Sequence, residues 1–220
     1  MNETREKERR LESMAQLAAS IRGLCDAAVS TAAPPDVVNE LREQVDAVTD
    51  RLLREQHDGP YSGLMQLPLD FNDPHSLLPL SPIIGRFNPT APDVDLHFDE
   101  GTVRGRAKLG KRHIGPPGAA HGGVTALIAD QLIAVAPFAI DSKLAYVTRT
   151  LTIRYRAPTP LYRELSLEAS CETHGDGYPE RVVTQGTIRD GDRTTVEIEA
   201  ETVSAPKVTR PKERTPAPRL

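Results

Sequence analysis

The sequence predicts an α+β domain in which one long helix lies against a single antiparallel sheet. Six stretches between residues 93 and 203 alternate apolar and polar residues, which is typical of strands with one buried face. Two gaps between them are tight turns, Asp99-Glu100-Gly101 and Asp190-Gly191-Asp192. One helical pattern falls between the second and third stretch, and a helix inserted into an antiparallel meander is an α+β arrangement. The expected strands are 93–98, 102–109, 144–156, 161–172, 181–189 and 194–203.

The inserted helix is expected from about residue 120 to 136. Its apolar residues recur at helical spacing, and Pro137 follows as a terminator. The residues that set this spacing are Val124, Leu127, Ile128, Leu132 and Val135.

A loop rich in glycine and proline leads into this helix. Residues 115–123 read Gly-Pro-Pro-Gly-Ala-Ala-His-Gly-Gly. The prolines hold the loop extended, and Gly122-Gly123 let a ligand approach the backbone amides at the helix start. Such amides can stabilise the oxyanion that develops when an activated acyl group is hydrolysed.

Asp130 supplies a carboxylate two turns into the helix. A rotation of about 100° per residue places it beside Gly123, Ala126 and Ala134, a strip of small side chains that a slender substrate could enter. A solvated surface aspartate is the alternative interpretation. The combination of loop, glycines and small residues favours a base or nucleophile for acyl hydrolysis.

The spacing also predicts an oligomer. At about 1.5 Å per residue, Asp130 lies roughly 10 Å along the axis from Gly123, too far for one carbonyl to contact both ends. A second copy of the helix running antiparallel would bring a partner's Gly122 amide beside Asp130. We therefore expect a symmetric dimer with two shared sites. The sequence does not distinguish a dimer from a dimer of dimers.

The order of HGG, an Asp nine residues after the His, and the strand sequences YVTRTLTIRY and APTPL resembles the PaaI-like branch of the hotdog-fold acyl-CoA thioesterases. The GPPG-x-x-HGG variant is similar to the loop of vertebrate mitochondrial long-chain members of that superfamily. The resemblance covers about residues 82–204. It implies a hotdog fold, an antiparallel sheet wrapped around one long central helix, in a dimer that hydrolyses acyl-CoA without a metal or cofactor.

The resemblance also implies roles for individual residues. Asp130 matches the catalytic acid, as nucleophile or general base, and the Gly122 amide matches the oxyanion donor. His121 flanks that donor, and Thr148 matches a strand residue thought to orient water or substrate. Each has a structural alternative: the His121 side chain satisfies a loop backbone group, and Thr148 is a β-branched residue typical of a strand. Many relatives carry Asn where this chain has Gly115, so one polar contact is absent or comes from elsewhere.

Two further groups of residues carry expectations. Leu151, Ile153 and Tyr155 mark the buried face of the strand after the helix, while Arg154 and Arg156 lie on the opposite face with Thr150 and Thr152, solvated or facing phosphates. Lys108, Lys111 and Arg112, just before the loop, are the candidates for binding the phosphates of coenzyme A.

The chain divides into three parts: a helical extension with its connection (1–80), the hotdog domain (81–205) and a basic, proline-rich tail (206–220) expected to be disordered. Two apolar stripes predict two amphipathic helices that pack on the core or cap a substrate channel. The connection's apolar residues should cover an acyl tunnel or the core. The stripes are Leu11, Met14, Leu17, Ala18, Ile21 and Leu24, then Val38, Leu41, Val45, Val48 and Leu52.

Composition narrows the function classes. A formal net charge of −4 over 220 residues argues against nucleic acid as the main partner. Two cysteines and unpaired histidines provide neither a disulfide framework nor a metal site. No apolar stretch reaches the length of a membrane span, and the N-terminus is unlike a signal peptide, so we expect a cytoplasmic protein. A non-catalytic acyl-CoA sensor and a hotdog assembly module remain the alternatives to an enzyme.

Overall fold

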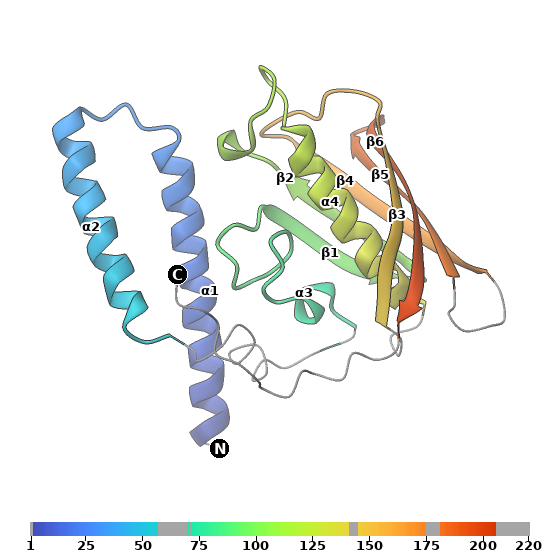
Figure 1. The fold of residues 1–220 in the computed structure, drawn as a ribbon, viewed down its shortest axis with the longest axis horizontal. Coiled ribbons are helices and arrows are strands. Elements are labelled where there is room, and N and C mark those ends of the chain that lie inside the picture. Colours follow the sequence, from blue (N-terminus) through green and yellow to red (C-terminus); the bar gives the residue numbers. More distant parts are fainter. Residues whose placement is uncertain (1, 57–69, 71, 141–144, 175–180, 206–220) are drawn as a thin grey trace.

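The chain folds around a six-stranded antiparallel sheet (Figure 1). The computed structural model describes residues 2–56, 70, 72–140, 145–174 and 181–205. The strand order is β1-β2-β4-β5-β6-β3, and every neighbouring pair is antiparallel. The predicted fold class is confirmed. The strands are β1 (Asp93–Asp99), β2 (Thr102–Lys108), β3 (Ala145–Tyr155), β4 (Glu164–His174), β5 (Arg181–Asp190) and β6 (Arg193–Ala205).

One face of the sheet is covered by α4 (Gly122–Val135), the predicted central helix. Its side chains Ile128, Leu132 and Ile133 are at most 1% exposed and join the core formed by the inner faces of the strands. Pro137 falls in a short 3₁₀ turn, η3 (Ala136–Ala139), that follows α4 directly. Proline cannot donate the backbone hydrogen bond that would continue the α-helix, which explains this end.

The segment Gly122–Ala139 is also apolar enough to cross a membrane by length and composition, with a mean hydropathy of 1.5. Within the described part of the chain it is the one such candidate. The assignment is weak, because half of the segment is buried inside the domain and the core helix of a globular fold meets the same criterion.

Strand β3 lies at one edge of the sheet, with β6 as its neighbour. Leu151 and Ile153 pack against the core as predicted. Tyr155 corrects the prediction, because its side chain is 56% exposed rather than buried. Tyr155 is the last residue of β3, and its side chain contacts Gly122 at the start of α4 instead of entering the core.

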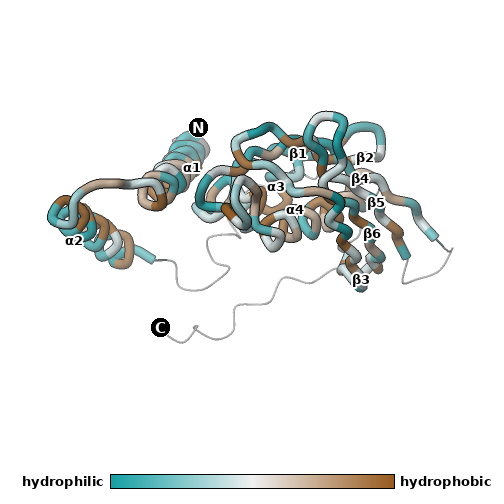
Figure 2. Tube along the Cα trace, turned by 90° about the horizontal axis from the view of Figure 1, so that it is seen from above, coloured by the Kyte–Doolittle hydropathy of each residue, from teal (hydrophilic) through white to brown (hydrophobic). Residues whose placement is uncertain are grey.

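The N-terminal extension forms α1 (Asn2–Ala28) and α2 (Pro35–Leu53), as the apolar stripes predict. Ala15 and Ala18 of α1 are buried. No residue of α2 is buried, and Val48 and Leu52 are about half exposed, so the expected packing on the core holds for α1 only. Figure 2 shows α2 on the side of α1 away from the sheet.

The connection between the extension and β1 packs partly against the core. It contains the single turn α3 (Pro74–Leu77), and Ile83 and Ile84 enter the hydrophobic cluster. The His75 ring donates from Nδ1 to the Ile84 carbonyl (2.8 Å) and accepts the Leu96 amide at Nε2 (3.0 Å), which ties this segment to β1. Residues 57–69, residue 71 and the predicted tail 206–220 lie outside the described residues.

Candidate active site

The loop before α4 is a small hairpin held at its base. The Gly115 amide donates to the Ala119 carbonyl (2.9 Å), and the Ala119 amide donates to the Pro116 carbonyl (2.9 Å). Gly118 has a φ of +78°, which only glycine adopts without strain. At the exit, the His121 amide donates to the His113 carbonyl (2.8 Å). These bonds fix where the helix begins.

His121 caps the helix with its side chain. Its Nδ1 accepts the Gly123 amide at 3.0 Å, which satisfies one of the unpaired donors at the helix start. Because Nδ1 is the acceptor, the hydrogen-bond network assigns the proton of a neutral ring to Nε2. The geometry therefore gives His121 the backbone-satisfying role that was the alternative interpretation.

The Gly122 amide is left free by this arrangement. The His121 carbonyl accepts the amides of Val124 (2.9 Å) and Thr125 (3.3 Å), so it points into the helix. In a trans peptide the N–H points opposite to the carbonyl, and the Gly122 N–H is therefore directed out of the helix start. Among the described residues no acceptor pairs with it. An outward amide at the positive end of a helix is a suitable oxyanion donor.

Two hydroxyl groups that sequence reasoning missed hold the Gly122 carbonyl. Thr125 Oγ1 donates to it at 2.9 Å from within the helix, and Tyr155 Oη donates at 3.0 Å from the end of β3. The spacing of Ser or Thr three residues after a helix start could have indicated the first. No sequence signal indicates the second, which joins residues 33 positions apart.

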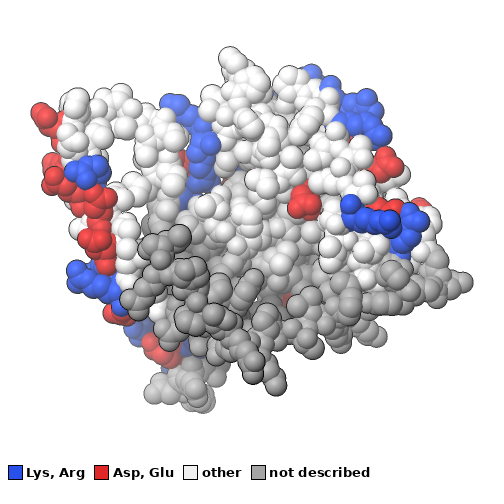
Figure 3. All heavy atoms as spheres, viewed as in Figure 1, with Lys and Arg blue, Asp and Glu red and all other residues white. Residues whose placement is uncertain are grey.

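Asp130 lies on the face of α4 that the sheet does not cover. It is exposed, as are Gly123 and Leu127, while Ala126 and Ala134 beside them are half-buried. This is the predicted strip, with Leu127 (51% exposed) as its one large side chain. No hydrogen bond or ion pair links the Asp130 carboxylate to another described residue. Figure 3 shows that the face of the molecule carrying α4 is mostly uncharged.

Asp130 and the Gly122 amide of the same chain cannot contact one carbonyl. They are eight residues apart on one helix, which corresponds to roughly 12 Å along its axis. The single chain thus carries both groups on α4, with Asp130 exposed and Gly122 half-buried, without bringing them together.

Thr148 lies on β3, half-buried and opposite Thr202 of β6. The register shifts immediately after it, between Thr148 and Thr150. Such irregularities redirect side chains, but the Thr148 hydroxyl forms no hydrogen bond with another described residue. Its role stays a prediction. Further along β3, Arg154 pairs with Glu199 (3.2 Å) and Arg156 with Glu197 (2.8 Å), as exposed ion pairs.

The three predicted phosphate ligands differ in availability. Lys108 and Lys111 are exposed, whereas the Arg112 side chain is only 14% exposed and contacts α1. Arg112 donates to the Arg22 carbonyl (3.1 Å), and its Nε lies 3.6 Å from Asp26. Burial and the neighbouring Arg112 guanidinium also lower the pKa of His113. Arg112 thus anchors α1 beside the loop.

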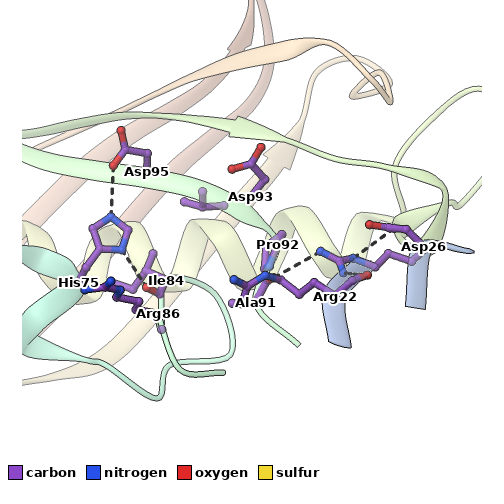
Figure 4. A pocket seen from close by; sticks show the side chains of 12 residues that line it. Arg22, Asp26, His75, Ile84, Arg86, Ala91, Pro92, Asp93 and Asp95 are labelled. Carbon is purple, nitrogen blue, oxygen red and sulfur yellow. Dashed lines mark hydrogen bonds and ion pairs between the residues drawn. The ribbon is translucent and has the colours of Figure 1, made fainter. Parts of the chain in front are cut away.

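A cavity of about 440 Å³ lies where α1 meets the segment before β1 (Figure 4). Arg22, Arg86 and Arg112 line it together with Asp26, Asp93 and other residues. Arg112 is its one predicted site residue, and neither Asp130 nor Gly122 belongs to the lining. The cavity is therefore separate from the chemistry expected on α4.

The described residues offer no group of three or more His, Cys, Asp or Glu side chains that could hold a metal ion. Burial raises the pKa of the Cys171 thiol to about 11, which keeps it protonated at neutral pH.

Gly115 occupies its position for a steric reason. A Cβ added there would lie 2.7 Å from His121 Cα and 2.9 Å from its backbone nitrogen. Both are backbone atoms that cannot move aside without shifting the helix start. The close approach of the two backbones explains why this chain has Gly where many relatives were expected to have Asn.

Comparison with known proteins agrees with the observed fold. Residues 117–197 match the family model of the thioesterase superfamily. A crystal structure of a thioesterase superfamily protein superposes with a TM-score of 0.71 at 28% identity, covering 86% of this chain and 93% of that one. The share of the chain that is covered is larger than residues 81–220 alone would make up, so the similarity includes part of the N-terminal extension. No curated protein matches the chain.

Two solved structures overlap with about half of the chain. A hypothetical thioesterase from Streptococcus pneumoniae, solved with coenzyme A, is 20% identical with a TM-score of 0.45, covering 51% of this chain and 89% of its own. The PaaI protein of the E. coli phenylacetic acid degradation operon is 19% identical with a TM-score of 0.43, covering 51% and 80%. The family match and the first structure confirm the resemblance to the thioesterase superfamily.

The Gly115 contact gives a testable expectation. The Gly115→Asn variant should lose about 1–3 kcal/mol of unfolding free energy, because the new side chain collides with the His121 backbone. Gly23→Asn is the matched control, because its site on α1 is open and its backbone does not have a positive φ. Urea denaturation compares the two, and a Gly115→Asn variant as stable as the wild type would contradict the steric explanation.

Proposed function

Since the chain carries a hotdog domain of the thioesterase superfamily, we propose that it is an acyl-CoA thioesterase that hydrolyses acyl-CoA to the free acid and coenzyme A. The observation that carries this proposal is the outward Gly122 amide at the start of a helix that also carries an exposed, unpaired carboxylate, Asp130. A donor for an oxyanion and a group that accepts a proton are the two components of this hydrolysis.

The Gly122 amide binds the thioester carbonyl oxygen. Negative charge grows on this oxygen as the carbonyl carbon becomes tetrahedral, and the N–H together with the positive end of α4 stabilises it. The donor is held before the substrate arrives, because the His121 carbonyl is fixed by two amides of the helix.

Asp130 activates water. Its carboxylate accepts a proton as the water oxygen forms a bond to the thioester carbon, and the intermediate collapses when the carbon–sulfur bond breaks. The coenzyme A thiolate leaves and takes up a proton. Direct attack by Asp130 on the thioester would instead form an anhydride that water then hydrolyses. The active unit holds no metal in this scheme.

A second copy of the chain completes the site. Gly122 and Asp130 are too far apart on one helix, whereas an antiparallel partner helix brings the donor of one copy beside the carboxylate of the other. Two observations support a homodimer, alone or as a dimer of dimers. Among the described strands β3 lies at the edge of the sheet, and Leu127 of α4 and Val147 of β3 are each more than half exposed.

The phosphates of coenzyme A are assigned to Lys108 and Lys111, whose side chains are exposed beside the loop. Arg112 would join them only by releasing its contacts with α1. A non-catalytic acyl-CoA sensor is the second candidate, and Gly115 favours it because the polar side chain of many relatives is absent there. Steady release of thiol from acyl-CoA distinguishes the two, because a sensor binds without turnover.

The Asp130→Asn variant should lose about two to four orders of magnitude in kcat, as expected when a general base is removed. Thiol release across short, long and aromatic acyl-CoAs measures this loss, with circular dichroism to verify folding. A folded Asp130→Asn protein with wild-type turnover would exclude the role.

The Gly122 amide can be removed without breaking the helix. Gly122 is the first residue of α4, where proline is well accepted, and His121 before it has φ −65° and ψ 133°, which proline requires of its predecessor. Gly122→Pro should therefore lower kcat about 100-fold or more, as loss of an oxyanion donor does.

Gly122→Ala is the matched control. It keeps the N–H, and its Cβ meets the Tyr155 ring at an ordinary 3.5 Å. Equal activity of the two variants in the thiol-release assay would contradict the assignment of the donor.

A further inference from the structure

We propose that Tyr155 is a positioning residue for the oxyanion donor, an inference that rests on the proposed thioesterase activity. The hydroxyl of Tyr155 donates to the Gly122 carbonyl at 3.0 Å. Gly122 also supplies the amide assigned to the oxyanion. Tyr155 thus restrains Gly122, whose amide binds the substrate oxygen, and does not itself contact the reacting atoms.

The start of α4 needs such a restraint because two consecutive glycines open it. Glycine loses more backbone freedom on folding than other residues, so a Gly-Gly helix start tends to fray. His121 restrains Gly123 through its amide, and the His121 carbonyl restrains the preceding peptide. The Gly122 carbonyl is a further group through which this turn is held.

Tyr155 and Thr125 restrain that carbonyl in different ways. Thr125 is 1% exposed and lies three residues after Gly122 on the same helix. Its hydroxyl would therefore move together with the helix. The Tyr155 hydroxyl reaches from the last residue of β3, in the sheet. Of the two hydroxyls, Tyr155 is therefore the one that fixes the helix start relative to the sheet.

The restraint reaches the amide through Gly122 itself. The two peptide planes on either side of Gly122 Cα can rotate against one another about φ and ψ. Holding the His121 carbonyl fixes one plane and holding the Gly122 carbonyl fixes the other. The direction of the Gly122 N–H is then set in advance, which is the condition for strong stabilisation of an oxyanion.

The Tyr155 ring supports the same role. A Cβ built on Gly122 would lie 3.5–3.6 Å from the ring carbons and the hydroxyl, so the ring packs directly against this residue. This contact explains why Tyr155 is placed at the helix and remains 56% exposed, where the strand pattern predicted burial.

The test is the Tyr155→Phe variant, which keeps the ring and removes the hydroxyl. Its kcat for acyl-CoA should fall about fivefold, the equivalent of one neutral hydrogen bond of about 1 kcal/mol, with KM unchanged. Amide hydrogen exchange at Gly123 and Val124, whose amides are hydrogen-bonded to His121, should become faster when followed by NMR. Tyr162→Phe is the matched control: Tyr162 is 62% exposed, its hydroxyl bonds to no other described residue, and neither readout should change.

Wild-type kcat in Tyr155→Phe, or unchanged exchange at the helix start, would overturn the positioning role. A different result concerns the proposed function alone: if the wild-type protein releases no thiol from any acyl-CoA, the thioesterase assignment fails. The exchange comparison is independent of activity and still decides whether Tyr155 holds the helix start.

Discussion

The proposed active site depends on one peptide group, between His121 and Gly122. Its carbonyl accepts two amides of the first helical turn, so its N–H must point outward, where no described residue pairs with it. The hairpin from residue 114 to 120, the bond from His121 to the His113 carbonyl and the imidazole cap on Gly123 all act on this one junction. A free donor at the positive end of a helix is costly to leave unsatisfied and useful once an oxyanion forms beside it.

The length of α4 sets the second constraint. The helix separates the donor from the Asp130 carboxylate by two turns, and its buried face is committed to the sheet. Neither the Asp130 carboxylate nor the Gly122 amide is paired within the described chain, and an antiparallel helix of a second copy would combine them. The free edge of β3 and the exposed Leu127 are features that a monomer would be expected to cover or to charge.

The elements of the sheet and α4 could be predicted to within three residues, because alternation and helical spacing report which face of each element is buried. Contacts between residues far apart in the sequence could not be predicted in this way. The strand pattern placed Tyr155 in the core, since alternation cannot show that a strand end lies beside a helix start. Amphipathicity likewise predicted α1 and α2, but it shows which face of a helix is apolar and not what covers that face. Ala18 of α1 is buried, while Val48 of α2 is 55% exposed.

The most direct test of a site shared between two copies is a mixed dimer of Asp130→Asn and Gly122→Pro chains, isolated through two different affinity tags. If each site takes the carboxylate from one copy and the amide from the other, one site of the mixed dimer carries both defects and its twin carries none. A shared site predicts about half of the wild-type thiol release per dimer, although each variant alone is nearly inactive. A mixed dimer as inactive as its parents would show that donor and carboxylate act within one chain, which contradicts a shared site.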